Sequence, residues 1–292
     1  MDIAHLAARA AEAPDSPGQR LLRRVEAEEL QRQHIAQRNT ALGRVAFGIT
    51  LLASWELASG PILDQFFVSK PSHIAAALWD MLVKETLLYH LQFTILEAVS
   101  GYLIGAGGGL VLGFVLARLD LVYRIVEPFV VAFYGIPRIA LAPLFILWFG
   151  IGITSKIAVA AILVFFIVFI NTIAGIRSAP TQFLQIARVM GASEWDLVRK
   201  VVFPAATPFI IAALQITVPQ AMIGAIVGEF ISSNRGVGHL ISRAAGFLDT
   251  AGLFAGIFAL LVVVLAMNQG ITVLGNYLMR WNPKHGTVRD VS

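Results

Sequence analysis

Long runs of residues without a charge are the feature that most limits what this chain can fold into. A helix needs about 20 mostly apolar residues to cross a bilayer, because each residue adds only ~1.5 Å to a hydrocarbon path of ~30 Å. A weaker run, 45–63, contains Glu56, and the run that begins at Ile139 extends back to about Ile125 with Arg138 inside it. The sequence therefore predicts an all-α, polytopic membrane protein with six transmembrane helices. The five uncharged runs are 98–117, 139–155, 157–176, 201–228 and 251–279.

Composition and motif content narrow the function. Only 14% of the residues are charged and 57% are hydrophobic, whereas soluble domains carry about 25% charged residues. The chain has no cysteine, which excludes disulfides, thiol catalysis and cysteine-bound metals. It has no phosphate-binding P-loop, no H-E-x-x-H and no G-x-S-x-G motif, and its six histidines are dispersed. We therefore expect a non-catalytic chain with no cofactor and no metal site.

The distribution of basic residues indicates the topology. Five of the 22 basic residues, Lys70, Lys84, Lys156, Arg235 and Arg243, fall on one predicted side, and Arg138 falls within a span. The remaining 16 lie on the side of both termini, which the positive-inside rule assigns to the cytoplasm. The positive net charge of +4 thus indicates membrane topology and not a nucleic-acid partner. We expect a cytosolic N-terminal extension at 1–40, a membrane domain at 41–281 and a cytosolic tail at 282–292. For the extension, a segment lying along the membrane surface is favoured over a specific docking role.

Glycines recur at every fourth position of the second predicted span. On a helix they form one smooth stripe, where the backbone of a neighbouring helix can approach closely. The same glycines lack the spacing of a dinucleotide-binding fingerprint, so we interpret them as a packing surface. They are Gly101, Gly105, Gly109 and Gly113.

A polar segment at 185–204, QIARVMGASEWDLVRKVVFP, lies between two of the long apolar runs. Gly191 suits a helix C-terminus, where a left-handed residue closes the last turn. Ser193 can cap a second helix that has Glu194 in its positively polarised first turn. Pro204 either stops this helix or begins the next apolar one. The segment predicts a pair of short helices outside the bilayer. A soluble partner could bind these helices and move them.

This segment resembles the cytoplasmic Glu-Ala-Ala loop of permease subunits in binding-protein-dependent ABC importers. The positions that match the family pattern are Gln185, Ile186, Ala187, Gly191 and Pro204. Gln185 stands where the family has a glutamate and Ile186 where it has an alanine. If the family glutamate makes an ionic contact with the ATPase, Gln185 supplies a neutral hydrogen bond instead.

A second stretch is similar to one branch of these permeases. GIPRIALAPLFILWFGIGITSK, residues 135–156, resembles the third span of permeases for nitrate, aliphatic sulfonates, taurine and related compounds, and RGVGHLI from Arg235 fits the same branch. Members of the branch also carry thiamine-pyrimidine precursors, riboflavin and aromatic carboxylates. The resemblance covers about residues 41–281.

The resemblance implies a type I ABC importer permease fold in the cell inner membrane, with both termini cytoplasmic. It implies two cytosolic ATPase copies that bind the ATP, a second permease copy, and a periplasmic or lipid-anchored binding protein. That binding protein delivers a small solute, with an anionic solute such as a sulfonate, taurine or nitrate, or a related organic compound, favoured. Membrane lipid surrounds the spans. The coupling loop would occupy 178–207, and the residues assigned to it are Gln185, Ala187, Arg188, Gly191, Ala192, Glu194 and Pro204.

Arg138 is the charge that most needs an explanation. It lies beside Pro137, and Pro143 follows six residues after Pro137, so this span is expected to be kinked. A charge at such a depth costs about 2.5–3.5 kcal/mol on insertion scales, so it needs a partner or a wet cavity. Arg138 could attract anionic cargo in the pathway, or it could pair with Glu97 or Glu229 or reach the headgroups. The structural role is favoured.

Three further residues are candidates for the pathway. Glu229 follows a small-residue stretch at 224–228, where a gate and a dimer contact are equally plausible. For Met222 apolar packing is favoured over lining the cavity, and for Tyr134 a hydrogen-bonded structural role is favoured. An ion-coupled secondary transporter is the alternative function, but it would normally have internal repeats and intramembrane acidic relays.

Overall fold

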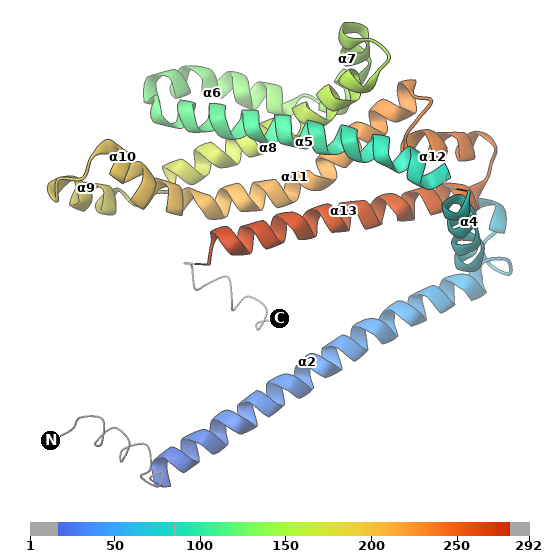
Figure 1. Ribbon diagram of the computed structural model, residues 1–292, viewed down its shortest axis with the longest axis horizontal. Helices are drawn as coiled ribbons and strands as arrows, with labels where there is room; N and C mark the ends of the chain where they lie inside the picture. The colour runs from blue at the N-terminus through green and yellow to red at the C-terminus, as the bar shows by residue number, and fades with distance from the viewer. Residues whose placement is uncertain (1–16, 85, 281–292) are drawn as a thin grey trace. The chain divides into compact units, whose positions relative to one another are not determined.

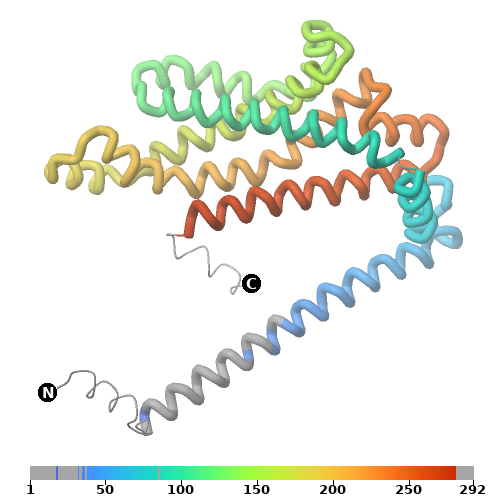
Figure 2. Tube along the Cα trace, in the orientation of Figure 1, coloured from blue at the N-terminus to red at the C-terminus, as the bar shows by residue number. Residues whose placement is uncertain are grey.

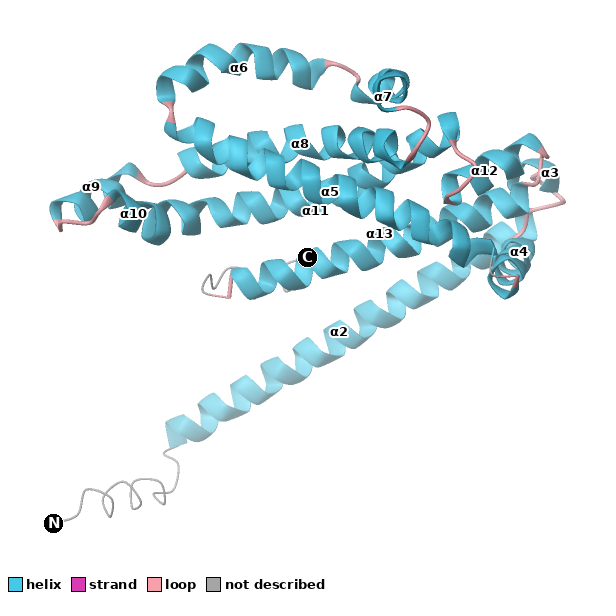
Figure 3. Ribbon diagram, turned by 45° about the horizontal axis from the view of Figure 1, so that its top comes forward, coloured by secondary structure: helices cyan, strands magenta, loops and turns pink. Residues whose placement is uncertain are grey.

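The structure, a computed structural model, describes residues 17–84 and 86–280. Within these ranges all of the regular elements are helices, as Figure 3 shows, apart from one isolated bridge between Ser59 and Leu63. The chain divides into two compact units, 1–64 and 65–292. The predicted all-α class is therefore confirmed.

The first unit contains one long helix, α2 (Pro17–Ala58), whose apolar part Arg38–Ala58 is long enough to cross a membrane. The predicted span 45–63 therefore begins earlier and ends earlier than expected. Gly60 has a φ of +118° and is followed by Pro61, which has no N–H to donate, so the helix cannot continue. The predicted boundary between the N-terminal extension and the membrane domain falls at residue 40, where α2 continues without a break. That boundary stays a prediction.

The second unit contains the remaining elements. Within this unit, α9 and α10 lie at one end and α12 lies at the opposite end (Figure 1, Figure 2). The elements are α3 (Gln65–Val68), α4 (Pro71–Val83), α5 (Thr86–Arg118), α6 (Asp120–Gly135), the 3₁₀ helix η1 (Arg138–Leu141), α7 (Ala142–Phe149), α8 (Ile153–Arg177), α9 (Thr181–Val189), α10 (Glu194–Leu197), the π-helix η2 (Val198–Val202), α11 (Phe203–Ser232), α12 (Val237–Gly246) and α13 (Thr250–Leu278).

The glycine stripe of α5 packs against α8, as the spacing predicted. A Cβ atom on Gly109 would lie 2.8 Å from the carbonyl oxygen of Phe165, and one on Gly113 would lie 2.9 Å from that of Phe169. Only a residue without a side chain lets the two backbones approach this closely. α11 uses the same device against α8, because a Cβ atom on Gly224 would lie 2.8 Å from the backbone nitrogen of Ala160.

The third predicted span is broken rather than continuous. Five single helices in the described residues can cross a membrane, and α6 with the η1–α7 segment makes a sixth span only as a pair bent by 85°. The break falls at Ile136 and Pro137, because the residue before a proline is pushed out of the helical region. The apolar run 139–155 is likewise not one helix, since α7 ends before Gly150, which has a φ of +79°.

The α5–α8 contact can be tested with two glycine substitutions on the same helix. Gly109→Ala should lower the free energy of unfolding by about 1–3 kcal/mol, because the two backbones must move apart. Gly107→Ala is the control, since nothing lies within 4 Å of a Cβ atom there. Thermal unfolding in detergent should give a lower midpoint for Gly109→Ala alone, and equal midpoints for the two variants would contradict the packing.

Candidate functional site

The helix pair between α8 and α11 is fixed by its own backbone at the turn. Gly191 has a φ of +81°. Its N–H donates to the carbonyl of Arg188 at 2.9 Å, and the N–H of Ala192 donates to the carbonyl of Ala187 at 3.0 Å. These two bonds form a Schellman motif that satisfies the last carbonyls of α9. The helix end predicted at Gly191 is therefore present.

The second helix begins with a capping box. The side-chain oxygen of Ser193 accepts a bond from the N–H of Asp196 at 3.2 Å, and the Asp196 carboxylate accepts one from the N–H of Ser193 at 3.3 Å. The reciprocal bonds satisfy two otherwise unpaired donors. Ser193 thus caps the helix as expected, and Asp196 completes the capping box.

The second helix is not a separate element. α10 passes through the π-helix η2 into α11, and Pro204 lies in the first turn of α11. Of the two outcomes left open for Pro204, the structure has the one in which it begins the long helix. Residues 194–232 therefore form one continuous rod from the turn into the bilayer.

Glu194, at the start of α10, forms ion pairs with the ends of α5 and α9. Its carboxylate lies 3.2 Å from the Arg118 guanidinium at the end of α5 and 3.3 Å from that of Arg188 in α9. All three side chains are largely exposed, so each pair contributes only about 0–1 kcal/mol. The ion pairs orient the helix pair more than they stabilise it.

Apolar side chains project from this otherwise polar segment. Val189 is 90% exposed, and Met190 and Trp195 are also exposed, on either side of the Gly191 turn. Gln185 is exposed on α9 as well. A cluster of exposed large apolar side chains next to charges is typical of a protein contact surface. We call Val189, Met190 and Trp195 the apolar tip.

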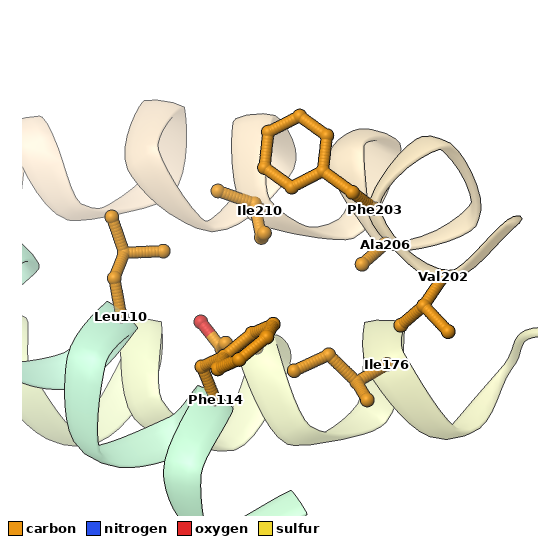
Figure 4. A pocket seen from close by; sticks show the side chains of 8 residues that line it. Leu110, Phe114, Ile176, Val202, Phe203, Ala206 and Ile210 are labelled. Carbon is orange, nitrogen blue, oxygen red and sulfur yellow. The ribbon is translucent and has the colours of Figure 1, made fainter. Parts of the chain in front are cut away.

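A small apolar cavity lies where the π-helix meets the bundle. Figure 4 shows its lining side chains, and its volume is about 160 Å³. Single-turn π-helices occur often at functional sites, because the extra residue makes the helix easy to rearrange. The cavity leaves space beside η2 for such a rearrangement. It is lined by Leu110 and Phe114 of α5, Thr172 and Ile176 of α8, Val202 of η2, and Phe203, Ala206 and Ile210 of α11.

The structure brings two of the four pathway candidates together. The Arg138 guanidinium lies 4.7 Å from the centre of the Tyr134 ring, at the break between α6 and η1. One guanidinium nitrogen, Nη1, is buried without a hydrogen-bond partner. A cation over an aromatic face is stabilised by the ring quadrupole, so Tyr134 holds Arg138 by its ring.

The other two candidates lie in the packed interior. Met222 is buried in a core cluster with residues of α5, α12 and α13, and Glu229 is 1% exposed. The pairing of Arg138 with Glu97 or Glu229 is not the arrangement found. Glu97 pairs with Lys156 at 3.1 Å, and Glu229 is hydrogen-bonded to Thr94 at 2.7 Å.

Residues 109–280 match the family described as binding-protein-dependent transport system inner membrane component. The chain belongs to this family of ABC importer permeases. The resemblance inferred from the loop segment is therefore confirmed, and so is a multi-pass location in the inner membrane. An ion-coupled secondary transporter gains no support from this match.

Three permeases named for different solutes are similar to this one. The riboflavin transport system permease RibX of Chloroflexus aurantiacus is 34% identical over 82% of this chain and 90% of its own length. The formylaminopyrimidine permease ThiX of Halalkalibacterium halodurans is 34% identical over 84% and 97%. The putative aliphatic sulfonates permease SsuC of Bacillus subtilis is 32% identical over 79% and 84%.

An inward-facing structure of the MetNI methionine ABC transporter has the same fold. It aligns with a TM-score of 0.52 at 22% identity, covering 64% of this permease and 93% of the aligned chain. The type I permease fold expected from the sequence is thus confirmed.

Two features of this permease are not predicted from its sequence. The sequence predicts Lys156 on the external side, and the structure buries it in the first turn of α8, where it is 5% exposed. No helix is predicted at 237–246, because Gly236 and Gly238 weaken any helical pattern. The proximity of Lys156 to Glu97 could not be inferred, since 59 residues separate them in sequence. Within 17–84 and 86–280, no group of three His, Asp or Glu side chains could hold a metal ion.

The capping box can be tested by local hydrogen exchange. Ser193→Ala should speed exchange of amides in 194–202 about fivefold, because loss of an N-cap costs about 1 kcal/mol. Ser193→Thr keeps the acceptor oxygen and serves as the control. Mass spectrometry of the purified permease measures both, and identical exchange in the Ala and Thr variants would show that the cap does not hold α10.

Proposed function

We propose that this permease couples the movements of cytosolic ATPases to import of a small solute, and that 178–207 is its coupling loop. The observation that carries the proposal is the apolar tip, held by the Schellman motif and the capping box and joined directly to α8 and α11. An exposed apolar surface at the end of the α10–α11 helix suits a segment on which a partner protein exerts force.

In this proposal the apolar tip docks in a cleft of the ATPase. Gln185, exposed on α9, would give the ATPase a neutral hydrogen bond. Ala187 and Ala192 are the small residues around the turn, and Arg188 and Glu194 orient it through their ion pair. Closure of the ATPases around ATP would then push on α10 and move α11, with rearrangement at η2 between them, where the apolar cavity leaves space.

The proposed assembly contains two ATPase copies, which bind all of the ATP, and two copies of this permease. The end of the second unit that bears α9 and α10 faces the cytoplasm together with both termini, following the excess of basic residues on that side. A periplasmic or lipid-anchored binding protein delivers the solute at the opposite end. The permease itself would be non-catalytic and would need no cofactor.

The cargo is proposed to be a small organic compound or anion of the kind named for its relatives, with an anion such as a sulfonate, taurine or nitrate favoured. Arg138 supports an anion, because its Nη1 is buried without a partner at the break in the third span. A guanidinium presents a flat set of donors that matches sulfonate and carboxylate oxygens. Met222 and Glu229 would contribute to a pathway only in a conformation that opens the interior.

Docking of the apolar tip can be tested with two exposed tryptophans. Trp195→Ala should weaken association with the ATPase at least tenfold, because buried aromatic anchors dominate contact energies. Trp148→Ala in α7 is the control, since Trp148 is similarly exposed, 62% against 70%, and lies outside the loop. Affinity would be measured in detergent with purified ATPase. Equal affinities for the two variants would refute docking through the tip.

The role of Arg138 can be tested by uptake into vesicles that contain all components. Arg138→Ala should reduce uptake of an anionic cargo at least tenfold while the complex still assembles, because the positive charge is lost. Arg124→Ala removes an exposed arginine of α6 and should leave uptake unchanged. A complex with Arg138→Ala that transports normally rules out the pathway role.

A further inference from the structure

A buried polar cluster lies at the end of the second unit opposite the coupling loop. Its members come from α5, α8 and α11, and four of them, Thr94, Glu97, Lys156 and Glu229, are almost fully buried. Charges at such burial are stable only when they are paired and hydrogen-bonded. The cluster is completed by His90 of α5 and by Ser233, which follows α11.

The cluster binds the N-terminus of α12. The Glu229 carboxylate accepts a bond from the N–H of Gly238. The Thr94 hydroxyl oxygen accepts one from the N–H of Val237 at 2.8 Å, and Nδ1 of His90 accepts one from the N–H of Gly236 at 3.0 Å. The first N–H groups of a helix have no partner within the helix, and here three successive ones are bound by side chains of other helices.

The glycines around the start of α12 make room for this cap. Gly236 has a φ of +100°, and a Cβ atom on it would clash with the carboxyl group of Glu229. A Cβ atom on Gly238 would lie 2.7 Å from a Glu229 carboxylate oxygen. The Gly-Val-Gly pattern of the RGVGHLI stretch is therefore explained by close approach of a carboxylate to the backbone.

Lys156 connects the cap to α8. Its ammonium group donates to Glu97 at 3.1 Å and to the hydroxyl of Ser233 at 2.7 Å. The same hydroxyl accepts a bond from the N–H of Arg235 at 3.1 Å, immediately before α12. The lysine stem fits against α11 because Gly228 has no side chain. One ammonium thus ties α8 to α5 and to the turn that leads into α12.

We propose that Glu229 and Thr94 are positioning residues of a latch that fixes α12 to α5 and α11, so that these helices and α8 move together at this end. The latch consists of His90, Thr94, Glu97, Lys156, Glu229 and Ser233. The part of the proposal that concerns transport rests on the proposed function: movement of α11 driven from the coupling loop reaches α12 through Glu229.

The latch itself can be tested without ATPase or cargo. Because the chain has no cysteine, Ala244→Cys, on the buried face of α12, provides a single thiol whose maleimide labelling reports release of the helix. Thr94→Val removes the hydroxyl but keeps the shape, and it should speed labelling at least tenfold, equivalent to about 1.4 kcal/mol of opening free energy. Thr94→Ser restores the hydroxyl and should restore slow labelling.

A second thiol position separates local release from general loosening. Ala117→Cys, at the other end of α5, is a matched probe, with Ala117 9% exposed and Ala244 8%. Its labelling should not change with Thr94→Val. Unchanged labelling at both positions, or an equal increase at both, would overturn the latch. Glu229→Gln, which keeps the side-chain shape but loses the charge, should raise labelling at position 244 in the same selective way.

The transport part is tested in the reconstituted complex. Thr94→Val should leave ATP hydrolysis at the parent rate while uptake falls at least tenfold, and Thr94→Ser should restore uptake. Normal uptake in Thr94→Val, or a parallel loss of hydrolysis and uptake, would overturn transmission through the latch. If the parent complex itself lacked ATP-driven uptake, the proposed function would fail while the labelling result still decided the latch.

Discussion

Close backbone contact with α8 is the interaction on which the second unit depends. α5 approaches α8 through its glycine stripe, and α11 approaches it from another side through glycines such as Gly228. Lipid tails are as apolar as the side chains, so helices in a membrane associate through packing and internal hydrogen bonds and not through exclusion of water. With α5, α8 and α11 in contact, the positions of the coupling loop and of the α12 end follow from the ends of the same three helices.

The two ends of this three-helix core differ in physical character. At the α9–α10 end the charges are paired but exposed, as for Glu194 with Arg118 and Arg188, and a small apolar cavity adjoins a π-helix. At the α12 end Lys156 and Glu229 are buried and hydrogen-bonded to other helices. Exposed pairs separate at little cost, whereas breaking a buried pair is expensive. Rearrangement is therefore expected at the first end and joint movement at the second.

Much of the fold could be predicted because its signals are local. The apolar runs predicted most of the spans, and the four-residue spacing of Gly105 and Gly109 predicted the packing face of α5. Gly191 and Ser193 predicted the turn of the proposed coupling loop. The break at Pro137 was expected only as a kink, since the angle depends on how α7 packs against α8. Of the alternatives left open for Arg138, pairing with Glu97 or Glu229 is not found, because a charge in a sequence does not specify which opposite charge it meets.

The sequence by itself determined which segments enter the membrane and where the coupling loop turns, because hydrophobicity, glycine conformation and helix capping act within a few residues of one another. Only the tertiary structure decided that Lys156 is buried and that α12 is a helix. The N-terminal N–H groups of α12 donate to side chains such as Thr94, which lies 143 positions away from Val237 in sequence. Such contacts depend on how whole helices pack, and the local pattern of residues does not specify that packing.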